Sequence, residues 1–304
     1  MRQRRWIVTG VALVALVATA AGCGSDDAST ADAGDQATST STASSTTAAG
    51  GSSTSAPGSV NTQPPADASD PSKETLRILV SNDDGIGAKG IDALVMALRM
   101  LPNTEVTVVA PKDNQSGTGS KMTEGDVAVA EATTISGYNG TAVSGYPSDA
   151  VIYALDKGGM PTRPHVVITG INEGANIGPL VNISGTVGAA RAAVAKGIPA
   201  LAVSQGFGKT FDYPSALPFV LDWVKRHRAA ILAGTAAVDV SNLNVPSCST
   251  GKVRGLEEVP GSTTGGAHAL EAQDCTSTLT HPADDVAAFN AGFAALTEPL
   301  RPKA

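Results

Sequence analysis

Two adjacent carboxylates follow a short apolar run near residue 80. The run "ILV" is followed by "SNDDG", in which Asp83 and Asp84 precede Gly85. Neighbouring side chains in a strand point to opposite faces, but at a strand end the turning chain lets both carboxylates converge. Such a pair repels itself unless a cation or a proton lies between the two groups. We therefore take Asp83 and Asp84 as candidate catalytic residues and ligands for Mg²⁺ or Mn²⁺, which bind oxygen. Simple turn chemistry is the alternative.

Polar, glycine-containing segments follow two other apolar runs. "APKDNQSGTGS" offers Asn114 and Ser116 as neutral donors or oxygen ligands, and "TGINEGANIG" offers Asn172 and Asn176. An asparagine can give a carbonyl oxygen to a metal or an amide N–H to a phosphate. Taken alone, the first of these segments would be interpreted as a mobile surface loop, and the second is ambiguous.

A fourth segment, "NISGTVGAA", leads directly into an alanine-rich pattern. Ser184, Gly185 and Thr186 would lie at the start of a helix, where free backbone N–H groups bind anions without any Lys or Arg. A simple N-cap is the alternative, because Ser and Thr cap helices routinely. Together, the four segments predict a metal and a phosphate at one rim of the fold.

The apolar runs and the helical patterns alternate along the chain. Four runs lack polar alternation, as expected of strands covered on both faces: "LRILVSN", "EVTVVAP", "HVVITG" and "ALAVSQ". Helical spacing follows in residues 91–98, 186–197 and 218–234. This order predicts an α/β fold with a mostly parallel sheet and helices on both faces, and ligands at the carboxyl ends of its strands.

The N-terminal segment has the residue order of a secretion signal. "MRQRR" is followed by an apolar stretch and by "TAAGC", which is typical of a lipoprotein signal peptide over residues 1–22 and a lipidated Cys23. An ordinary cleaved signal is the alternative. Residues 23–74 contain few large apolar side chains, which predicts a disordered tether. We expect one folded domain at 75–304, lipid-anchored outside the cytoplasm.

Two cysteines remain if Cys23 carries lipid. An oxidising compartment favours a disulfide between Cys248 and Cys275, and a catalytic thiol is the alternative. The net charge of −7 argues against a nucleic-acid duplex as partner, because binding a phosphate backbone needs clustered Lys and Arg. The four histidines lack the spacing of a zinc protease.

Several segments, in this order, resemble the SurE family of survival-protein nucleotidases. They are "ILVSNDDGIGAKGI", "VVAPKDNQSG", "GYPSDAV", "VVITGINEGANIG", "SGTVGAA" and "GIPALAVS". The resemblance extends from about residue 76 to residue 300. It implies a Rossmann-like α/β fold, a divalent-metal-dependent phosphatase acting on nucleoside monophosphates, and a C-terminal extension used for homodimer formation.

The resemblance also implies roles for individual residues. The metal ligands would be Asp83, Asp84, Ser116 and Asn172, and Asn82 would line the same pocket. The phosphate would be held by Asn176, Ser184, Gly185 and Thr186. Pro147 and Asp149 match a further family segment, which implies a scaffold role at the edge of the site; for Asp149 we favour the alternative, a salt-linked or capping role.

The expected activity is metal-dependent hydrolysis of a nucleoside monophosphate or another small phosphomonoester. An exported solute-binding lipoprotein is an alternative, since such a protein could keep the phosphate site and use the aspartates only to form the turn. An inactive relative that binds a phosphorylated ligand without turnover is a second alternative. The membrane would be contacted only through the N-terminal lipid.

Overall fold

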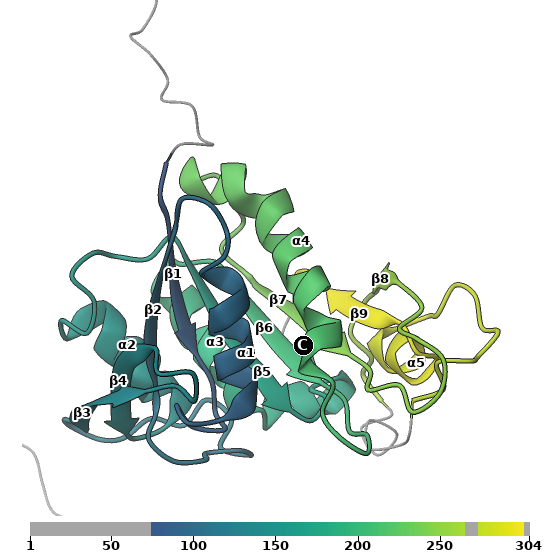
Figure 1. The fold of residues 1–304 in the computed structure, drawn as a ribbon, viewed down its shortest axis with the longest axis horizontal. Coiled ribbons are helices and arrows are strands. Elements are labelled where there is room, and N and C mark those ends of the chain that lie inside the picture. Colours follow the sequence, from purple (N-terminus) through teal and green to yellow (C-terminus); the bar gives the residue numbers. More distant parts are fainter. Residues whose placement is uncertain (1–73, 265–272, 301–304) are drawn as a thin grey trace, which may run out of the picture. The chain divides into compact units, whose positions relative to one another are not determined.

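A computed structural model describes residues 74–264 and 273–300 of the chain (Figure 1). Within these residues, the strands form one nine-stranded sheet. The strands are β1 (Leu76–Ser81), β2 (Thr104–Pro111), β3 (Ala128–Thr133), β4 (Asn139–Ser144), β5 (Val166–Glu173), β6 (Ala200–Gln205), β7 (Val240–Val245), β8 (Leu256–Glu258) and β9 (Ala294–Thr297). The helices are α1 (Lys89–Leu98), α2 (Pro147–Asp156), the 3-10 helix η1 (Gly178–Asn182), α3 (Gly185–Ala195), α4 (Tyr213–Leu232) and α5 (Asp285–Asn290).

The sheet is mostly parallel. Its strand order is β3-β4-β2-β1-β5-β6-β7-β9-β8, and the six strands from β4 to β7 run in one direction. β3 pairs antiparallel with β4, and β9 pairs antiparallel with β7. The chain steps from β1 outward to β2, then returns to β5 on the other side of β1. The strand order therefore reverses between β1 and β5, which is where ligands bind in open α/β sheets.

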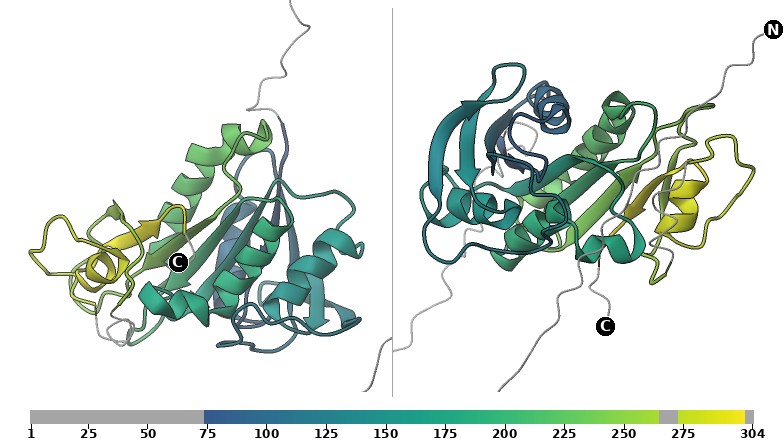
Figure 2. Two further views of the ribbon diagram at one scale, coloured as in Figure 1. Left: turned by 180° about the vertical axis from the view of Figure 1, so that it is seen from behind. Right: turned by 90° about the horizontal axis from the view of Figure 1, so that it is seen from below.

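Helices cover both faces of the sheet, as the sequence predicts (Figures 1 and 2). α1 and α4 pack on one face through side chains such as Leu94 and Val220, against β1 residues such as Ile78. α2 and α3 pack on the other face against Leu79. Adjacent residues of β1 thus enter opposite cores, which explains why its sequence is apolar without alternation.

The predicted strands and helices are present, and the structure adds others. The apolar runs correspond to β1, β2, β5 and β6, and the helical patterns to α1, α3 and α4. The β3–β4 hairpin, α2, β7 and the C-terminal elements were not predicted. β3 is short, and five of its six side chains are exposed, so its sequence carries little burial signal. α4 begins at Tyr213, earlier than expected, with Pro214 in its first turn and Pro218 inside it.

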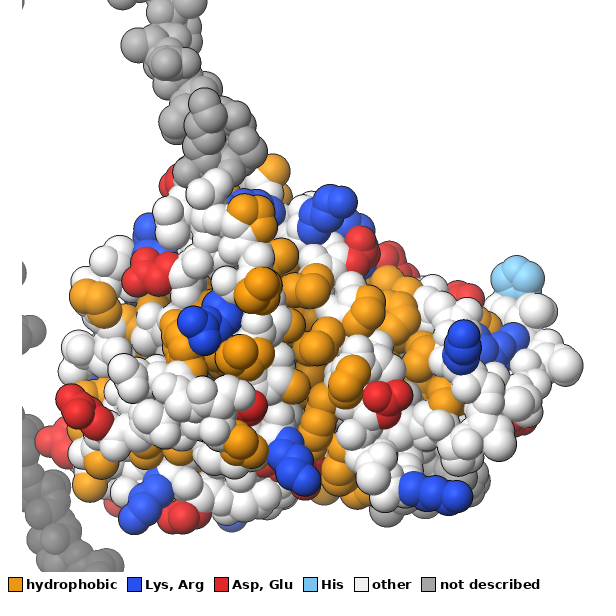
Figure 3. Space-filling view, in the orientation of Figure 1, with side chains coloured by type: hydrophobic (Ala, Val, Ile, Leu, Met, Phe, Trp, Pro, Cys, Tyr) orange, Lys and Arg blue, Asp and Glu red, His pale blue; other side chains and the backbone are white. Residues whose placement is uncertain are grey.

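Apolar side chains are also exposed on the face of the molecule that carries α1 and α4 (Figure 3). A shallow groove of about 410 Å³ on this face has Leu101, Leu221 and Val224 among its lining residues. Leu101 follows the C-terminal end of α1, which lies toward the amino ends of the parallel strands. The groove is therefore separate from the strand ends that carry Asp83 and Asp84.

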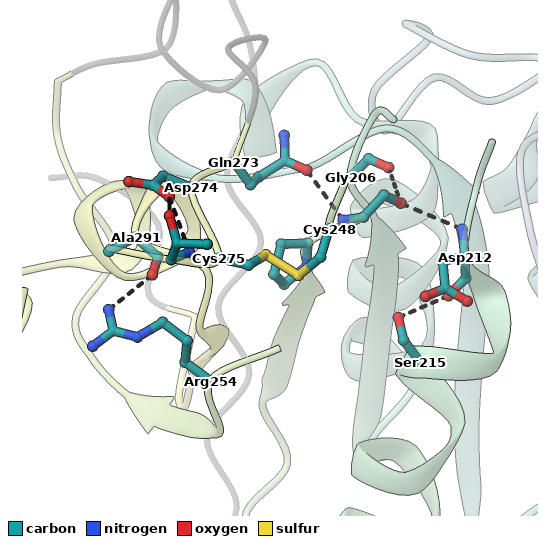
Figure 4. Close-up of a disulfide and its surroundings, with 12 residues drawn as sticks. Gly206, Asp212, Ser215, Cys248, Arg254, Gln273, Asp274, Cys275 and Ala291 are labelled. Carbon is teal, nitrogen blue, oxygen red and sulfur yellow. Dashed lines mark hydrogen bonds between the residues drawn. A yellow bond between two sulfur atoms is a disulfide. The ribbon is translucent and has the colours of Figure 1, made fainter. Parts of the chain in front are cut away.

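Cys248 and Cys275 are joined by a disulfide, with their Cα atoms 5.7 Å apart (Figure 4). The bond links the segment after β7 to the segment before α5. Beside it, the Gln273 side chain accepts a hydrogen bond from the Ser247 backbone N–H at 3.1 Å. The Ser247 hydroxyl donates to the carbonyl of Gly206 at 2.6 Å. The C-terminal segment is thereby connected to the loop that follows β6.

The expected signal peptide (residues 1–22), lipidated Cys23 and the tether through residue 73 lie outside the described residues. In the ranges that the structure does describe, none of the helices combines the length and the hydrophobicity that a membrane crossing requires.

Candidate active site

The candidate site lies at the carboxyl ends of β1, β2, β5 and β6. Asp83 and Asp84 follow β1, Asn172 is near the end of the neighbouring β5, and the 112–120 loop follows β2. β1 and β5 are paired up to Ser81 and Thr169, after which β5 has a register irregularity before Asn172. Such irregularities in a strand redirect the side chains that follow. Parallel pairing thus brings together residues that are almost 90 positions apart.

Asp83 is buried against the start of α3. Its side chain is only 2% exposed, and the Thr186 hydroxyl donates to its Oδ1 at 2.5 Å. A Cβ atom on Gly185 would lie 2.8 Å from both Cβ and Oδ2 of Asp83, so only glycine allows this close approach. Burial raises the pKa of Asp83, while hydrogen bonds from Thr186 and from nearby backbone N–H groups oppose the rise.

Asp84 lies beside Asp83 and contacts two other loops. Its Oδ2 accepts the backbone N–H of Glu173 at 3.1 Å, and its Oδ1 lies 3.5 Å from the amide nitrogen of Asn114. Burial, the neighbouring charge of Asp83 and, more weakly, the charge of Glu173 raise the pKa of Asp84 to about 7. Both acids therefore have a raised pKa, chiefly because burial disfavours their ionised forms.

No basic side chain of residues 74–264 and 273–300 forms a salt bridge with either acid. Within the same ranges, His, Cys, Asp and Glu side chains do not gather in threes to form a metal cluster. Any cation at this site would therefore be held by two carboxylates and neutral oxygens, a ligand set that suits Mg²⁺ or Mn²⁺ better than zinc.

Neutral oxygens suitable for a cation are present beside the acids. The Oδ1 atoms of Asn82 and Asn172 are buried and have no hydrogen-bond donor. Each amide uses its nitrogen locally: Asn82 donates to the carbonyl of Gly85 at 2.8 Å, and Asn172 to that of Gly174 at 2.7 Å. Since buried polar atoms are nearly always satisfied, these two orphaned oxygens are consistent with an oxygen-seeking ion.

The loop after β2 reaches the acids through its backbone. The Gln115 N–H donates to the carbonyl of Asp83 at 2.6 Å. Ser116 is the next residue; it is exposed, and its N–H donates to the side-chain oxygen of Asn114 at 2.9 Å. The structure thus brings the loop that contains Ser116 to the acid pair, as the sequence predicts.

The residues expected to hold phosphate already have partners in this structure. The Ser184 hydroxyl accepts the Val187 N–H at 3.0 Å, as an N-cap does, and Thr186 donates to Asp83. The side-chain amide of Asn176 donates to the Ser204 hydroxyl at 2.8 Å, and the backbone carbonyl of Asn176 accepts from the side-chain amide of Asn242 at 2.8 Å. Phosphate binding by Asn176, Ser184, Gly185 and Thr186 stays a prediction.

Asp149 has the expected capping role at α2, the helix that begins with Pro147. Its carboxylate accepts the Tyr146 N–H at 2.8 Å and the Thr123 hydroxyl at 2.6 Å. It therefore fixes the start of α2.

Glu173 and Tyr213 were not singled out from the sequence. The Tyr213 hydroxyl donates to Oε1 of Glu173 at 2.8 Å, and the Glu173 N–H donates to Asp84. Glu173 follows Asn172 directly and could have been included on that ground. Tyr213 had no such signal, because its partner is 40 residues away in the chain.

The chain is similar to known proteins over most of its described part. Residues 78–268 match the family model described as survival protein SurE. The chain is 37% identical to the 5'-nucleotidase SurE of Desulfovibrio desulfuricans over 190 residues, which cover 61% of this chain and 72% of that protein. It is 40% identical to the 5'-nucleotidase SurE of Pelobacter propionicus, covering 59% and 69% of the two chains. The crystal structure of a SurE protein from Aquifex aeolicus shares the fold, with a TM-score of 0.58, 23% identity and coverage of 75% and 94%.

Proposed function

Because the chain belongs to the SurE family, we propose that it is a metal-dependent 5'-nucleotidase that releases phosphate from nucleoside monophosphates. One observation carries the proposal beyond family membership. Two adjacent acids, both with a raised pKa, lie at the point where the strand order reverses, with no basic side chain paired to them among the described residues. Perturbed acids at such a place are typical of an active site.

The residues of the site fit a divalent cation. Asp83 and Asp84 would supply charged oxygens, and Asn172 and Ser116 neutral ones. The orphaned Oδ1 of Asn172 supports this assignment, since a ligand oxygen needs no donor from the protein. A bound Mg²⁺ or Mn²⁺ would polarise a phosphoryl oxygen of the substrate and lower the pKa of a water molecule.

The residues around the acids keep them in position. Thr186 fixes the orientation of the Asp83 carboxylate, while the backbone of Glu173 holds Asp84. Asp84 is the less buried of the two acids, and its pKa without a bound cation is about 7, so a cation at the site would favour its ionised form. Asn82, Asn176, Ser184, Gly185 and Thr186 are our candidates for contacts to the phosphate, supported by the position of the last three at the start of α3.

The direct test is phosphate release from AMP by the purified protein with Mn²⁺, with Mg²⁺ and with EDTA. We expect turnover with metal and none with the chelator. Asp83→Asn should lower kcat by a hundredfold or more, because it removes a charged ligand while Thr186 can still donate to the amide oxygen. Asp92→Asn is the matched control, since the Asp92 carboxylate is hydrogen-bonded to Thr134 and Ser136 and to none of the predicted site residues. Chelator-insensitive binding of AMP without turnover would favour a solute-binding protein or an inactive relative instead.

We also propose that the protein is exported and anchored by lipid on Cys23. The residue order of the segment before Cys23 supports this, and the Cys248–Cys275 disulfide is consistent with an oxidising compartment. Cell fractionation tests it: the wild-type protein should sediment with membranes, and Cys23→Ser should not. Equal distribution of the two would contradict the proposal.

A homodimer is a further proposal, based on the family resemblance of the C-terminal segment. Light scattering on the purified protein should give twice the mass of the chain. A monomeric mass at micromolar concentration would contradict it.

A further inference from the structure

A row of three aromatic rings lies next to the acid pair, after the end of β6. The ring centroids of Phe207 and Phe211 are 5.7 Å apart at an angle of 52°, and those of Phe211 and Tyr213 are 5.9 Å apart at 17°. Both separations are within the range of favourable aromatic contacts. The row begins in the loop after β6 and ends in the first turn of α4.

The two ends of the row lie against the neighbouring residues Glu173 and Gly174, and Glu173 contacts Asp84. Tyr213 donates to Glu173, whose backbone N–H donates to Asp84. Phe207 approaches the next residue, Gly174: a Cβ atom there would lie 2.9 Å from the Cζ atom of the ring. Gly174 also has a φ of +124°, which other residues rarely adopt. The absence of a side chain at Gly174 therefore lets the tip of the Phe207 ring reach the rim of the site.

The Phe207 side chain is more exposed to solvent than the other aromatic side chains of the described residues. It is 44% exposed, whereas the other Phe, Tyr and Trp side chains of residues 74–264 and 273–300 are buried or half-buried. Phe211 and Gly174 hold the ring in place on two sides. An aromatic ring with a fixed orientation and exposed surface, beside a phosphate site, is a suitable surface for stacking with another planar group.

We propose that Phe207 is a specificity-determining residue that stacks on the base of a nucleoside monophosphate whose phosphate lies at Asp83 and Asp84. The inference rests on the proposed function and extends it: the site selects phosphomonoesters that carry a planar group over those that carry only a sugar. The observation behind the inference is the position of Phe207 at Gly174, one residue after Glu173, whose backbone N–H donates to Asp84.

The test compares two substrates that differ only in the base, AMP and ribose 5-phosphate, with Mn²⁺ present. We expect Phe207→Ala to lower kcat/KM for AMP by about fivefold or more, the loss of one base–aromatic contact, and to leave ribose 5-phosphate unchanged. Phe207→Trp should retain the preference for AMP. Met100→Ala is the control variant, since Met100 is 81% exposed and lies after α1, away from the strand ends.

Two results would overturn the inference. In one, Phe207→Ala and the wild-type protein have the same ratio of kcat/KM for the two esters. In the other, Phe207→Ala loses activity on both esters equally, which would mean that the ring only supports the fold. If the wild-type protein releases phosphate from neither ester, the proposed function fails. Calorimetric affinities for the same pair then test the stacking: the inference requires AMP to bind more tightly, and Phe207→Ala to remove the difference.

Discussion

Replacing Asp84 by asparagine should stabilise the metal-free protein at alkaline pH. The pKa of Asp84 is about 7 in the folded chain against an ordinary value of 3.8. The folded state therefore retains a proton that the unfolded chain loses, and the free energy of unfolding falls as the pH rises from about 4 to about 7. Each pKa unit corresponds to about 1.4 kcal/mol, so the free energy of unfolding falls by at most about 4 kcal/mol over this pH range. We expect a fall of about 2 kcal/mol once the site relaxes around the ionised carboxylate.

The assay is urea denaturation in EDTA at pH 5 and at pH 8. Asp84→Asn should raise the free energy of unfolding at pH 8 by about 2 kcal/mol and by less than half as much at pH 5, where Asp84 is protonated in the folded wild-type protein but already ionised in the unfolded chain. Saturating Mn²⁺ should remove the advantage, because a cation stabilises the ionised wild-type pair more than the variant.

Asp92→Asn is the control, with the opposite sign. Although burial opposes it, hydrogen bonds from Thr134 and Ser136 lower the pKa of Asp92. This substitution should therefore destabilise the protein at both pH values. If Asp84→Asn is no more stable than the wild-type protein at pH 8 in EDTA, burial and the neighbouring charge of Asp83 do not destabilise ionised Asp84, and the physical reason for a cation at the site is lost.

Two further predictions test the Thr186–Asp83 hydrogen bond and the disulfide. Thr186→Val should weaken Mn²⁺ binding and lower kcat, because the buried Oδ1 of Asp83 loses a charge-assisted hydrogen bond. Thr186→Ser keeps the hydroxyl and should keep both Mn²⁺ affinity and kcat near the wild-type level. Equal kcat in the two variants would contradict the role of the hydroxyl. Replacing both Cys248 and Cys275 by serine should lower the free energy of unfolding by about 3–4 kcal/mol, as expected for the loop that this disulfide closes. Dithiothreitol should lower the free energy of unfolding of the wild-type protein to the same value. An unchanged urea midpoint in the double variant would contradict this.

The sequence predicts the central sheet because its strands are buried on both faces. β1, β5 and β6 contain short apolar runs without polar alternation, the pattern expected of strands covered on both faces. The β3–β4 hairpin was missed, because β3 consists of "AVAEAT" and is almost entirely exposed. The start of α4 differs from the prediction because Pro214 and Pro218 suggest an interruption; the first turn of a helix tolerates Pro214, and α4 continues through Pro218.

The sequence places the acid pair after a strand, and the structure has it directly after β1 at the carboxyl edge of the parallel strands, while its role as a metal site stays a prediction. The sequence does not show which loop side chains contact the acids and which remain available to a ligand. Thr186 was expected to contact phosphate, but in this structure its hydroxyl is used to hold Asp83. The contact between Tyr213 and Glu173 joins segments that are remote in the chain, so only the folded structure shows it.

The most direct measurement is a calorimetric titration of Mn²⁺ into the metal-free protein and into Asp83→Asn. The account predicts one ion for each wild-type chain, bound more tightly at pH 8 than at pH 5, and a large loss of affinity in the variant. No uptake by the wild-type protein at millimolar Mn²⁺ or Mg²⁺ would contradict it.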